Sequence, residues 1–124
     1  MPPYNILKDI FMCGFLSAFS NNYIENSSLD ELRKASNLIQ HRGPDDTSEV
    51  HLNVYFSVFH RLSIRDLSTS SRQPVVSNCE RYIICFNGEI YNISELSRLF
   101  PFNAKFKSDT LLLSNLISEK GIDA

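Results

Sequence analysis

The chain has 124 residues, of which 43% are hydrophobic, and this is enough apolar surface for a single globular core. Its 12 Lys and Arg against 14 Asp and Glu give a net charge of -2 with no basic run, which argues against a nucleic acid partner. Three cysteines without a Cys-x-x-Cys spacing indicate a reducing compartment, hence the cytoplasm, rather than a disulfide framework.

The first residues lack the signals of export or of a membrane span. Residues 1–12 contain Pro2 and Pro3 and show no hydrophobic period, so we expect an extension outside the fold or a mis-assigned start. The apolar run from Ile10 to Phe19 is too short to cross a bilayer, and the residues before it carry no net positive charge. We therefore expect residues 13–124 to form the folded part, without membrane contact.

Hydrophobic periodicity predicts a strand and then a helix in the first third of the chain. Residues 13–19 alternate loosely between two apolar faces, which is typical of a strand buried on both faces. A capping box of Ser28 and Glu31 begins a predicted helix over 28–40, where apolar residues recur at helical spacing. The Gly-Pro in residues 41–46 predicts a charged turn after this helix.

The middle of the chain predicts β-structure. Strict alternation of period two over residues 50–59 predicts one strand with an apolar face, leading directly into His60. Residues 68–74 are a loop by composition, and the apolar segments 75–76 and 82–86 predict a hairpin.

Two helices are predicted in the last third. Ser94 is the expected cap of a short helix that Pro101 ends, and residues 102–106 are expected to be extended. A final helix is predicted from Ser108 and Asp109 to about Lys120, where Gly121 supplies the stop signal.

The stretch Phe86-Asn87-Gly88-Glu89 allows two interpretations. Taken alone, Asn-Gly is the commonest short hairpin signal, because both residues tolerate a positive φ. Alternatively, an apolar strand here delivers an amide, a glycine and a carboxylate to a functional site.

A zinc site is a further alternative, but no two candidate ligands show the spacing of a zinc finger, so we expect no metal. The candidate ligands are Cys13, Cys79, Cys85, His41, His51 and His60.

Four segments of the chain occur together in one order. They are Met12-Cys13-Gly14, His41-Arg42-Gly43-Pro44-Asp45-Asp46, His60-Arg61-Leu62-Ser63-Ile64, and Asn87-Gly88-Glu89-Ile90-Tyr91-Asn92 with Ser108-Asp109. From Met12 onward the chain resembles the glutaminase (type-2 glutamine amidotransferase) domain of class II glutamine amidotransferases, in particular the asparagine synthetase branch.

This resemblance implies a fold and a reaction. The fold is α+β, an N-terminal-nucleophile αββα sandwich of antiparallel sheets between helix layers, and we expect it to be incomplete at the carboxyl end. The reaction is hydrolysis of glutamine to glutamate and ammonia, with the ammonia passed to a synthetase domain or chain for an acceptor such as aspartate. No cofactor is expected in this chain, and ATP and magnesium are expected only in a synthetase domain that it lacks.

The resemblance also implies catalytic roles. Cys13 is the expected nucleophile and forms a thioester with the substrate. Its own α-amino group is the expected base, since a free α-amine titrates close to neutral pH. Asn87 and Gly88 are expected to form the oxyanion hole through a side-chain amide and a backbone N–H.

The remaining implied roles concern binding of the substrate's amino acid end. Arg61 is expected to bind the α-carboxylate through its planar guanidinium, and Asp109 to pair with the α-ammonium. Glu89 is expected to hold the polar end of the pocket. Further backbone groups of the pocket come from Leu62, Ser63, Ile64 and Arg65.

Two departures from the family pattern change these expectations. Twelve residues precede Cys13, so its nitrogen lies in a peptide bond. We expect activity to require translation from Met12 or removal of a propeptide, and also completion of the domain. Missing C-terminal strands are expected to leave an exposed sheet edge. The alternative function is a non-catalytic, glutamine-binding remnant of a split or truncated synthetase gene.

Overall fold

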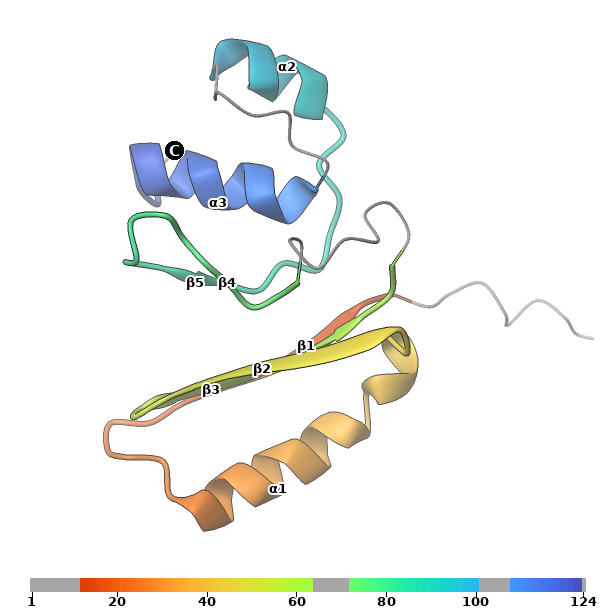
Figure 1. Ribbon diagram of the computed structural model, residues 1–124, viewed down its shortest axis with the longest axis vertical. Coiled ribbons are helices and arrows are strands. Elements are labelled where there is room, and N and C mark those ends of the chain that lie inside the picture. The colour runs from red at the N-terminus through yellow and green to blue at the C-terminus, as the bar shows by residue number, and fades with distance from the viewer. Residues whose placement is uncertain (1–11, 64–71, 101–107, 124) are drawn as a thin grey trace, which may run out of the picture. The chain divides into compact units, whose positions relative to one another are not determined.

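The computed structural model describes residues 12–63, 72–100 and 108–123 (Figure 1). The predictions for residues 1–11, for Ile64 and Arg65, and for an extended segment over 102–106 lie outside these ranges. The chain divides into two compact units, Met1–Leu62 and Ser63–Ala124. Helices and antiparallel sheets make up both units, which confirms the α+β class.

The first unit is a three-stranded antiparallel sheet with a helix on one face. Strands β1 (Gly14–Phe19), β2 (Asp46–Leu52) and β3 (Tyr55–Arg61) are arranged in the order β1-β3-β2. Helix α1 (Asn26–Asn37) lies across one face of this sheet, and the short 3-10 helix η1 (Gln40–Arg42) follows it (Figure 1). The central strand β3 therefore pairs on both edges.

The core of this unit lies between α1 and the sheet. Apolar side chains of β3 pack there because every second residue of a strand points to the same face. The buried cluster consists of Ile24, Leu29, Phe56 and Val58, with Leu16 and Leu32 packed against it.

Two sequence predictions for the first unit were wrong in detail. The helix begins at Asn26 after the N-cap Glu25, and no side-chain cap bond is made there, so Ser28 lies inside the helix and the capping box does not form. Strand β1 is not buried on both faces, because Phe15 is 39% and Phe19 73% exposed.

The strand predicted over residues 50–59 is two strands joined by a turn at Asn53 and Val54. The register pairs Leu52 with Tyr55 and Val50 with Ser57, and directly opposite residues share a face of the sheet. A two-residue turn thus moves the apolar residues of β2 to the face opposite the core residues of β3. The alternation predicted from the sequence continues through this turn and conceals it.

The second unit contains a short hairpin and two helices. Strands β4 (Val75–Val76) and β5 (Ile83–Ile84) pair antiparallel, as predicted. Helix α2 (Ile93–Leu99) begins after Asn92 rather than at Ser94. Helix α3 (Asp109–Lys120) packs against β4 and buries Leu112 almost completely.

The predicted end of α3 is confirmed. Gly121 follows the last helical residue with a φ of 81° and donates its N–H to the Ile117 carbonyl at 2.8 Å. Only glycine adopts this left-handed conformation without strain, so the stop signal has a direct conformational cause.

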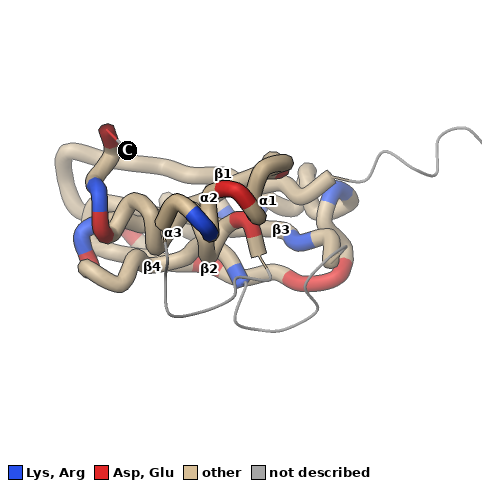
Figure 2. Tube along the Cα trace, turned by 90° about the horizontal axis from the view of Figure 1, so that it is seen from above, with Lys and Arg blue, Asp and Glu red and all other residues tan. Residues whose placement is uncertain are grey.

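Charged residues of both signs are interspersed along the described trace (Figure 2). No helix in the described ranges is long and apolar enough to span a membrane.

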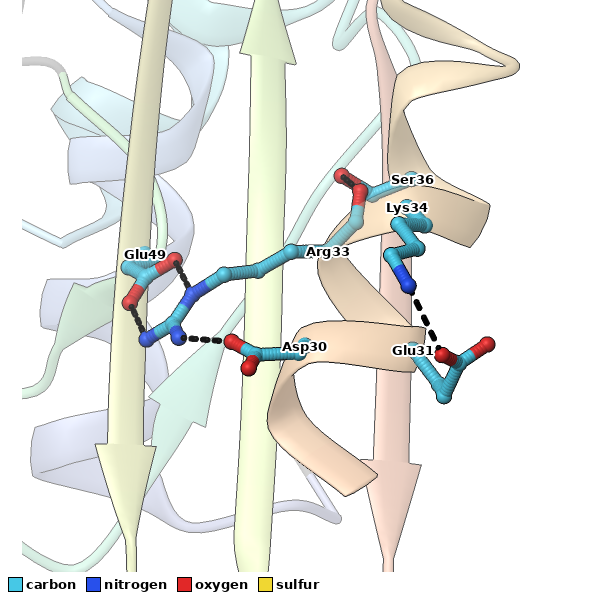
Figure 3. Close-up of polar contacts among 6 residues, drawn as sticks. All are labelled: Asp30, Glu31, Arg33, Lys34, Ser36 and Glu49. Carbon is cyan, nitrogen blue, oxygen red and sulfur yellow. Dashed lines mark hydrogen bonds and ion pairs between the residues drawn. The ribbon is translucent and has the colours of Figure 1, made fainter. Parts of the chain in front are cut away.

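An ion pair connects α1 to β2. Arg33 donates from Nε to Glu49 Oε2 at 3.1 Å and from Nη2 to Oε1 at 2.7 Å (Figure 3). Its guanidinium carbon lies 5.9 Å from the Phe56 ring centroid. A further bond from Nη1 reaches Asp30 at 3.3 Å. Hydrogen bonding from Arg33 is the main reason that the pKa of Glu49 lies below its ordinary value.

We expect Glu49→Gln to lower the thermal unfolding midpoint by a few degrees near neutral pH. A carboxylate whose pKa is depressed in the folded state stabilises the fold above its unfolded pKa, and this contribution is lost as pH falls through the folded pKa. The difference between variant and parent in a pH series of thermal melts should therefore shrink below about pH 4.

The matched control is Glu31→Gln, whose pair with Lys34 is 2.9 Å long but joins side chains that are 74% and 71% exposed. This variant should change the midpoint less than Glu49→Gln does. An equal loss in both variants, or a loss that persists unchanged in acid, would contradict a role for the Arg33–Glu49 pair.

Candidate functional site

Cys13 immediately precedes β1, and its thiol lies against the backbone of Leu62. The Leu62 N–H donates to Cys13 Sγ at 3.2 Å, and Sγ lies 3.6 Å from the Leu62 carbonyl oxygen, to which the thiol can donate. The two residues meet because β1 and β3 pair with Gly14 opposite His60. Cys13, the expected nucleophile, therefore lies beside Leu62, the residue that follows Arg61.

The segment of residues 41–46 supports the backbone beside this thiol. Arg42 Nε donates to the Cys13 carbonyl at 3.4 Å. A Cβ on Gly14 would lie 3.2 Å from Arg42 Cδ, so the arginine side chain packs directly over the strand start. These contacts hold the start of β1 against the segment of residues 41–46.

His60 is buried at the end of β3, with 1% of its surface exposed. Its Nε2 lies 3.0 Å from the Ser36 carbonyl and its Nδ1 lies 2.9 Å from the Thr47 hydroxyl. Because a carbonyl only accepts, Nε2 carries a proton and donates it to Ser36. The imidazole therefore joins α1, β2 and β3 next to Arg61.

Arg61 is the last residue of β3 and is half-buried. Its carbonyl accepts the Asp45 N–H at 3.0 Å, which joins the 41–46 segment to the end of the strand. Gly43 lies so close to the end of β3 that an added Cβ would collide with the His60 carbonyl and would come within 2.5 Å of Arg61 N. Leu62 and Ser63 follow as half-buried residues.

Asn87, Gly88 and Glu89 are exposed residues of the second unit. The hairpin interpretation of Asn-Gly was wrong, because the positive φ values in the described ranges occur at Glu80 and Gly121. A Cβ at position 88 would lie 3.0 Å from the Phe86 ring, a tight contact that a shift of the ring can relieve.

Asp109 is the first residue of α3, and it reaches back to the residues after Glu89. Its Oδ2 accepts the Ile90 N–H at 2.7 Å, a short bond of the kind that a charged acceptor makes. The second unit therefore brings Asp109 to the segment that holds Asn87, Gly88 and Glu89, although 19 residues separate Ile90 from Asp109.

The comparison with protein families gives one match over most of the chain. Residues 12–124 match the family described as the glutamine amidotransferase domain. The chain belongs to this family. Within it, the relatives indicate the class II amidotransferases.

Among curated proteins, this amidotransferase domain is 37% identical over 108 residues to the glutamine-hydrolyzing asparagine synthetase 1 of Bacillus subtilis (strain 168), covering 82% of the chain and 17% of that relative. It is 33% identical to the enzyme of the same name from Triphysaria versicolor, covering 89% and 19%. The human glutamine-hydrolyzing asparagine synthetase is 31% identical, with coverage of 90% and 20%. The chain thus spans about a fifth of the length of these relatives.

Two buried polar residues of the amidotransferase domain were not predicted as part of the site. His60 was considered as a zinc ligand and as the first residue of a motif, without a role of its own in the site. In the described parts of the chain no three His, Cys, Asp or Glu side chains form a metal-binding group. His60 follows Val58 by two residues and Phe56 by four, so the alternation along β3 places its imidazole on the core face. This spacing was the sequence signal for a buried histidine. Gln73, at the end of a polar loop sequence, gave no such signal.

Cys79 is a second thiol with a perturbed environment. It lies in the turn between β4 and β5, where Ser77 Oγ is 3.3 Å from its Sγ. This hydrogen bond is the main reason that the pKa of Cys79 lies below its ordinary value. Assays that label thiols must therefore distinguish Cys79 from Cys13.

We expect Gly43→Ala to lower the free energy of unfolding by about 3 kcal/mol, the upper end of the usual cost of overpacking. The new methyl group meets backbone atoms, which cannot rotate away as a side chain can. Urea unfolding followed by circular dichroism measures the loss. Gly14→Ala is the matched control, since its methyl group meets the flexible Arg42 side chain. Equal losses in the two variants would show that the close approach at Gly43 is not limiting.

Proposed function

We propose that this chain is the glutaminase part of an asparagine synthetase-like amidotransferase, which hydrolyses the side-chain amide of glutamine to glutamate and ammonia. Membership of the amidotransferase family and the glutamine-hydrolyzing relatives support this reaction. The observation that carries the proposal is the Cys13 thiol, held against the Leu62 backbone one residue after Arg61.

Cys13 is the nucleophile of the proposed reaction. Its sulfur attacks the amide carbon of glutamine, and a C–S bond forms while the carbonyl oxygen takes up negative charge. Collapse of this intermediate breaks the C–N bond, and the thiol proton leaves with the nitrogen as ammonia. Water then attacks the thioester carbon, which releases glutamate and returns the thiol.

The α-amino group of Cys13 is the base that carries the proton between sulfur and nitrogen. This role requires a free amine, and in the sequence the Cys13 nitrogen is bonded to Met12. The active form therefore begins at Cys13. Translation from Met12 followed by removal of this methionine is the preferred route, and proteolysis of a longer precursor is the other.

The substrate is bound by charge and hydrogen bonding. Arg61 binds the α-carboxylate of glutamine, a role that suits the paired donors of a guanidinium. Asp109 pairs with the α-ammonium, and Glu89 helps to hold the polar end of the pocket. Asn87 and Gly88 donate hydrogen bonds to the oxyanion. Backbone groups of the pocket come from Leu62, Ser63, Ile64 and Arg65.

The complete enzyme includes more than this chain. We propose the N-terminal-nucleophile sandwich as its fold, with further strands completing the sheets of residues 13–124. A synthetase domain or chain in the cytoplasm receives the ammonia, uses ATP and magnesium, and transfers the nitrogen to an acceptor such as aspartate. The glutaminase part itself needs no cofactor.

A chain that begins at Cys13 and is completed by further C-terminal strands, here called the Cys13-initiated chain, should release glutamate from glutamine, and Cys13→Ala should abolish this release. The thiol forms the covalent intermediate, so its removal leaves no alternative nucleophile. Glutamate production measured with glutamate dehydrogenase follows the reaction. Cys79→Ser is the matched control and should retain activity.

The 124-residue chain should release no glutamate, because its Cys13 nitrogen is in a peptide bond. If the Cys13-initiated chain binds glutamine but does not hydrolyse it, the catalytic proposal is wrong and the chain is a glutamine-binding remnant.

Arg61→Lys should raise the KM for glutamine about 10- to 100-fold with a smaller change in kcat. Lysine keeps the charge but loses one of two parallel hydrogen bonds to the carboxylate, a loss of about 1.5–3 kcal/mol. Steady-state kinetics of the Cys13-initiated chain measure both constants. The matched control Arg98→Lys, on the exposed face of α2, should leave both unchanged. A fall in kcat at constant KM would remove Arg61 from the carboxylate site.

A further inference from the structure

Gln73 lies just before β4, where the ladder with β5 has ended. The last backbone pair at this end joins Val75 to Ile84, and Gln73 and Pro74 form a bend with a cis peptide bond between them. Phe86 lies two residues beyond β5, outside the ladder.

The side chain of Gln73 makes two hydrogen bonds to the backbone of Phe86. Its Oε1 accepts the Phe86 N–H at 2.6 Å, and its Nε2 donates to the Phe86 carbonyl at 3.0 Å. These are the two bonds that an opposing strand residue makes, supplied here by a carboxamide. The orientation of the amide is determined by its partners, since a backbone N–H only donates and a carbonyl only accepts.

The second proton of Nε2 is also used. It is donated to the Thr110 hydroxyl at 2.9 Å, in the first turn of α3 and next to Asp109. Gln73 is 8% and Thr110 4% exposed, so water has little access to these bonds. A buried carboxamide with three partners holds them rigidly, because each unmade bond would leave a desolvated polar group.

These bonds surround the segment of Asn87, Gly88 and Glu89. Bonds to both the N–H and the carbonyl of Phe86 restrict the two backbone torsions of that residue. They therefore determine the direction in which the chain continues to Asn87. On the other side, Ile90 is bonded to Asp109. Both anchors end in the first turn of α3, at Thr110 and at Asp109.

We propose that Gln73 is the positioning residue of the oxyanion segment, and that it orients Asn87 and Gly88 through its paired bonds to Phe86. This inference rests on the proposed glutaminase function and deepens it. Gln73 itself does not touch substrate.

The first experiment needs no activity. In the uniformly ¹⁵N-labelled 124-residue chain, Gln73→Met replaces the carboxamide by an apolar side chain of similar length. Amide hydrogen exchange of Phe86 should become faster by roughly tenfold or more, while that of Tyr82 is unchanged. Unaltered exchange at Phe86 would overturn the proposal.

Ser77→Ala is the matched control in the same hairpin. Ser77 is 2% exposed and its Oγ accepts the Tyr82 N–H at 3.1 Å, so the variant removes a bond of similar burial away from Asn87. It should give the reciprocal result, with faster exchange at Tyr82 and unchanged exchange at Phe86. Faster exchange at both residues in both variants would indicate a general loosening of the hairpin and would overturn a specific role for Gln73.

The second experiment measures the kinetics of the Cys13-initiated chain. Gln73→Met should lower kcat about 10- to 100-fold with KM changed less than about twofold, because displaced oxyanion donors weaken binding of the transition state only. Ser77→Ala should leave both constants unchanged. If Gln73→Met does not fold, Gln73→Glu keeps the side-chain size but cannot donate to the Phe86 carbonyl when ionised, and should also lower kcat. Parental kcat in the folded variant would overturn the proposal.

The two experiments separate the two hypotheses. An inactive parent with the expected exchange pattern refutes the glutaminase function and leaves Gln73 as the anchor of Phe86. An active parent whose Phe86 exchange and kcat are insensitive to Gln73 refutes the positioning role and leaves the glutaminase function intact.

Discussion

The position of the Cys13 thiol depends on the antiparallel register between β1 and β3. Gly14 lies opposite His60, and this pairing brings the residue before β1 to the residue after β3. A slip of one residue would turn every side chain of β1 to the other face of the sheet. The buried bonds of His60 to Thr47 and to the Ser36 carbonyl oppose such a slip, because a shifted imidazole would lose both partners.

A different principle operates in the second unit, where the candidate residues lie on irregular backbone. Asn87, Gly88 and Glu89 belong to no strand or helix, and sheet pairing alone does not orient them. Hydrogen bonds from side chains to the backbone of Phe86 and of Ile90 orient them instead. The side chain at Phe86 is Gln73, which also bonds to Thr110 of α3, and the side chain at Ile90 is Asp109 of α3. A helix with an apolar face thus has a second role, as the support of an exposed polar segment.

The sequence predicted those elements whose limits have a local cause. Gly121 ends α3 through a conformation that favours glycine, and α3 was predicted within a residue. The turn at Asn53 and Val54 was missed because it contains neither glycine nor proline and does not interrupt the alternation of apolar residues. The candidate residues came from motif resemblance, whereas the contacts of His60 and Gln73 join segments distant in sequence, and no local pattern encodes them.

A side chain at Gly43 and one at Gly88 would meet different neighbours. At Gly43 the neighbour is the backbone between His60 and Arg61, so a substitution harms folding whether or not the chain is an enzyme. At Gly88 the neighbour is the Phe86 ring, on an exposed segment whose proposed role is catalytic. A side chain at position 43 therefore requires the backbone at the end of β3 to move, whereas a side chain at position 88 requires only a shift of the Phe86 ring, whose backbone Gln73 holds by two hydrogen bonds.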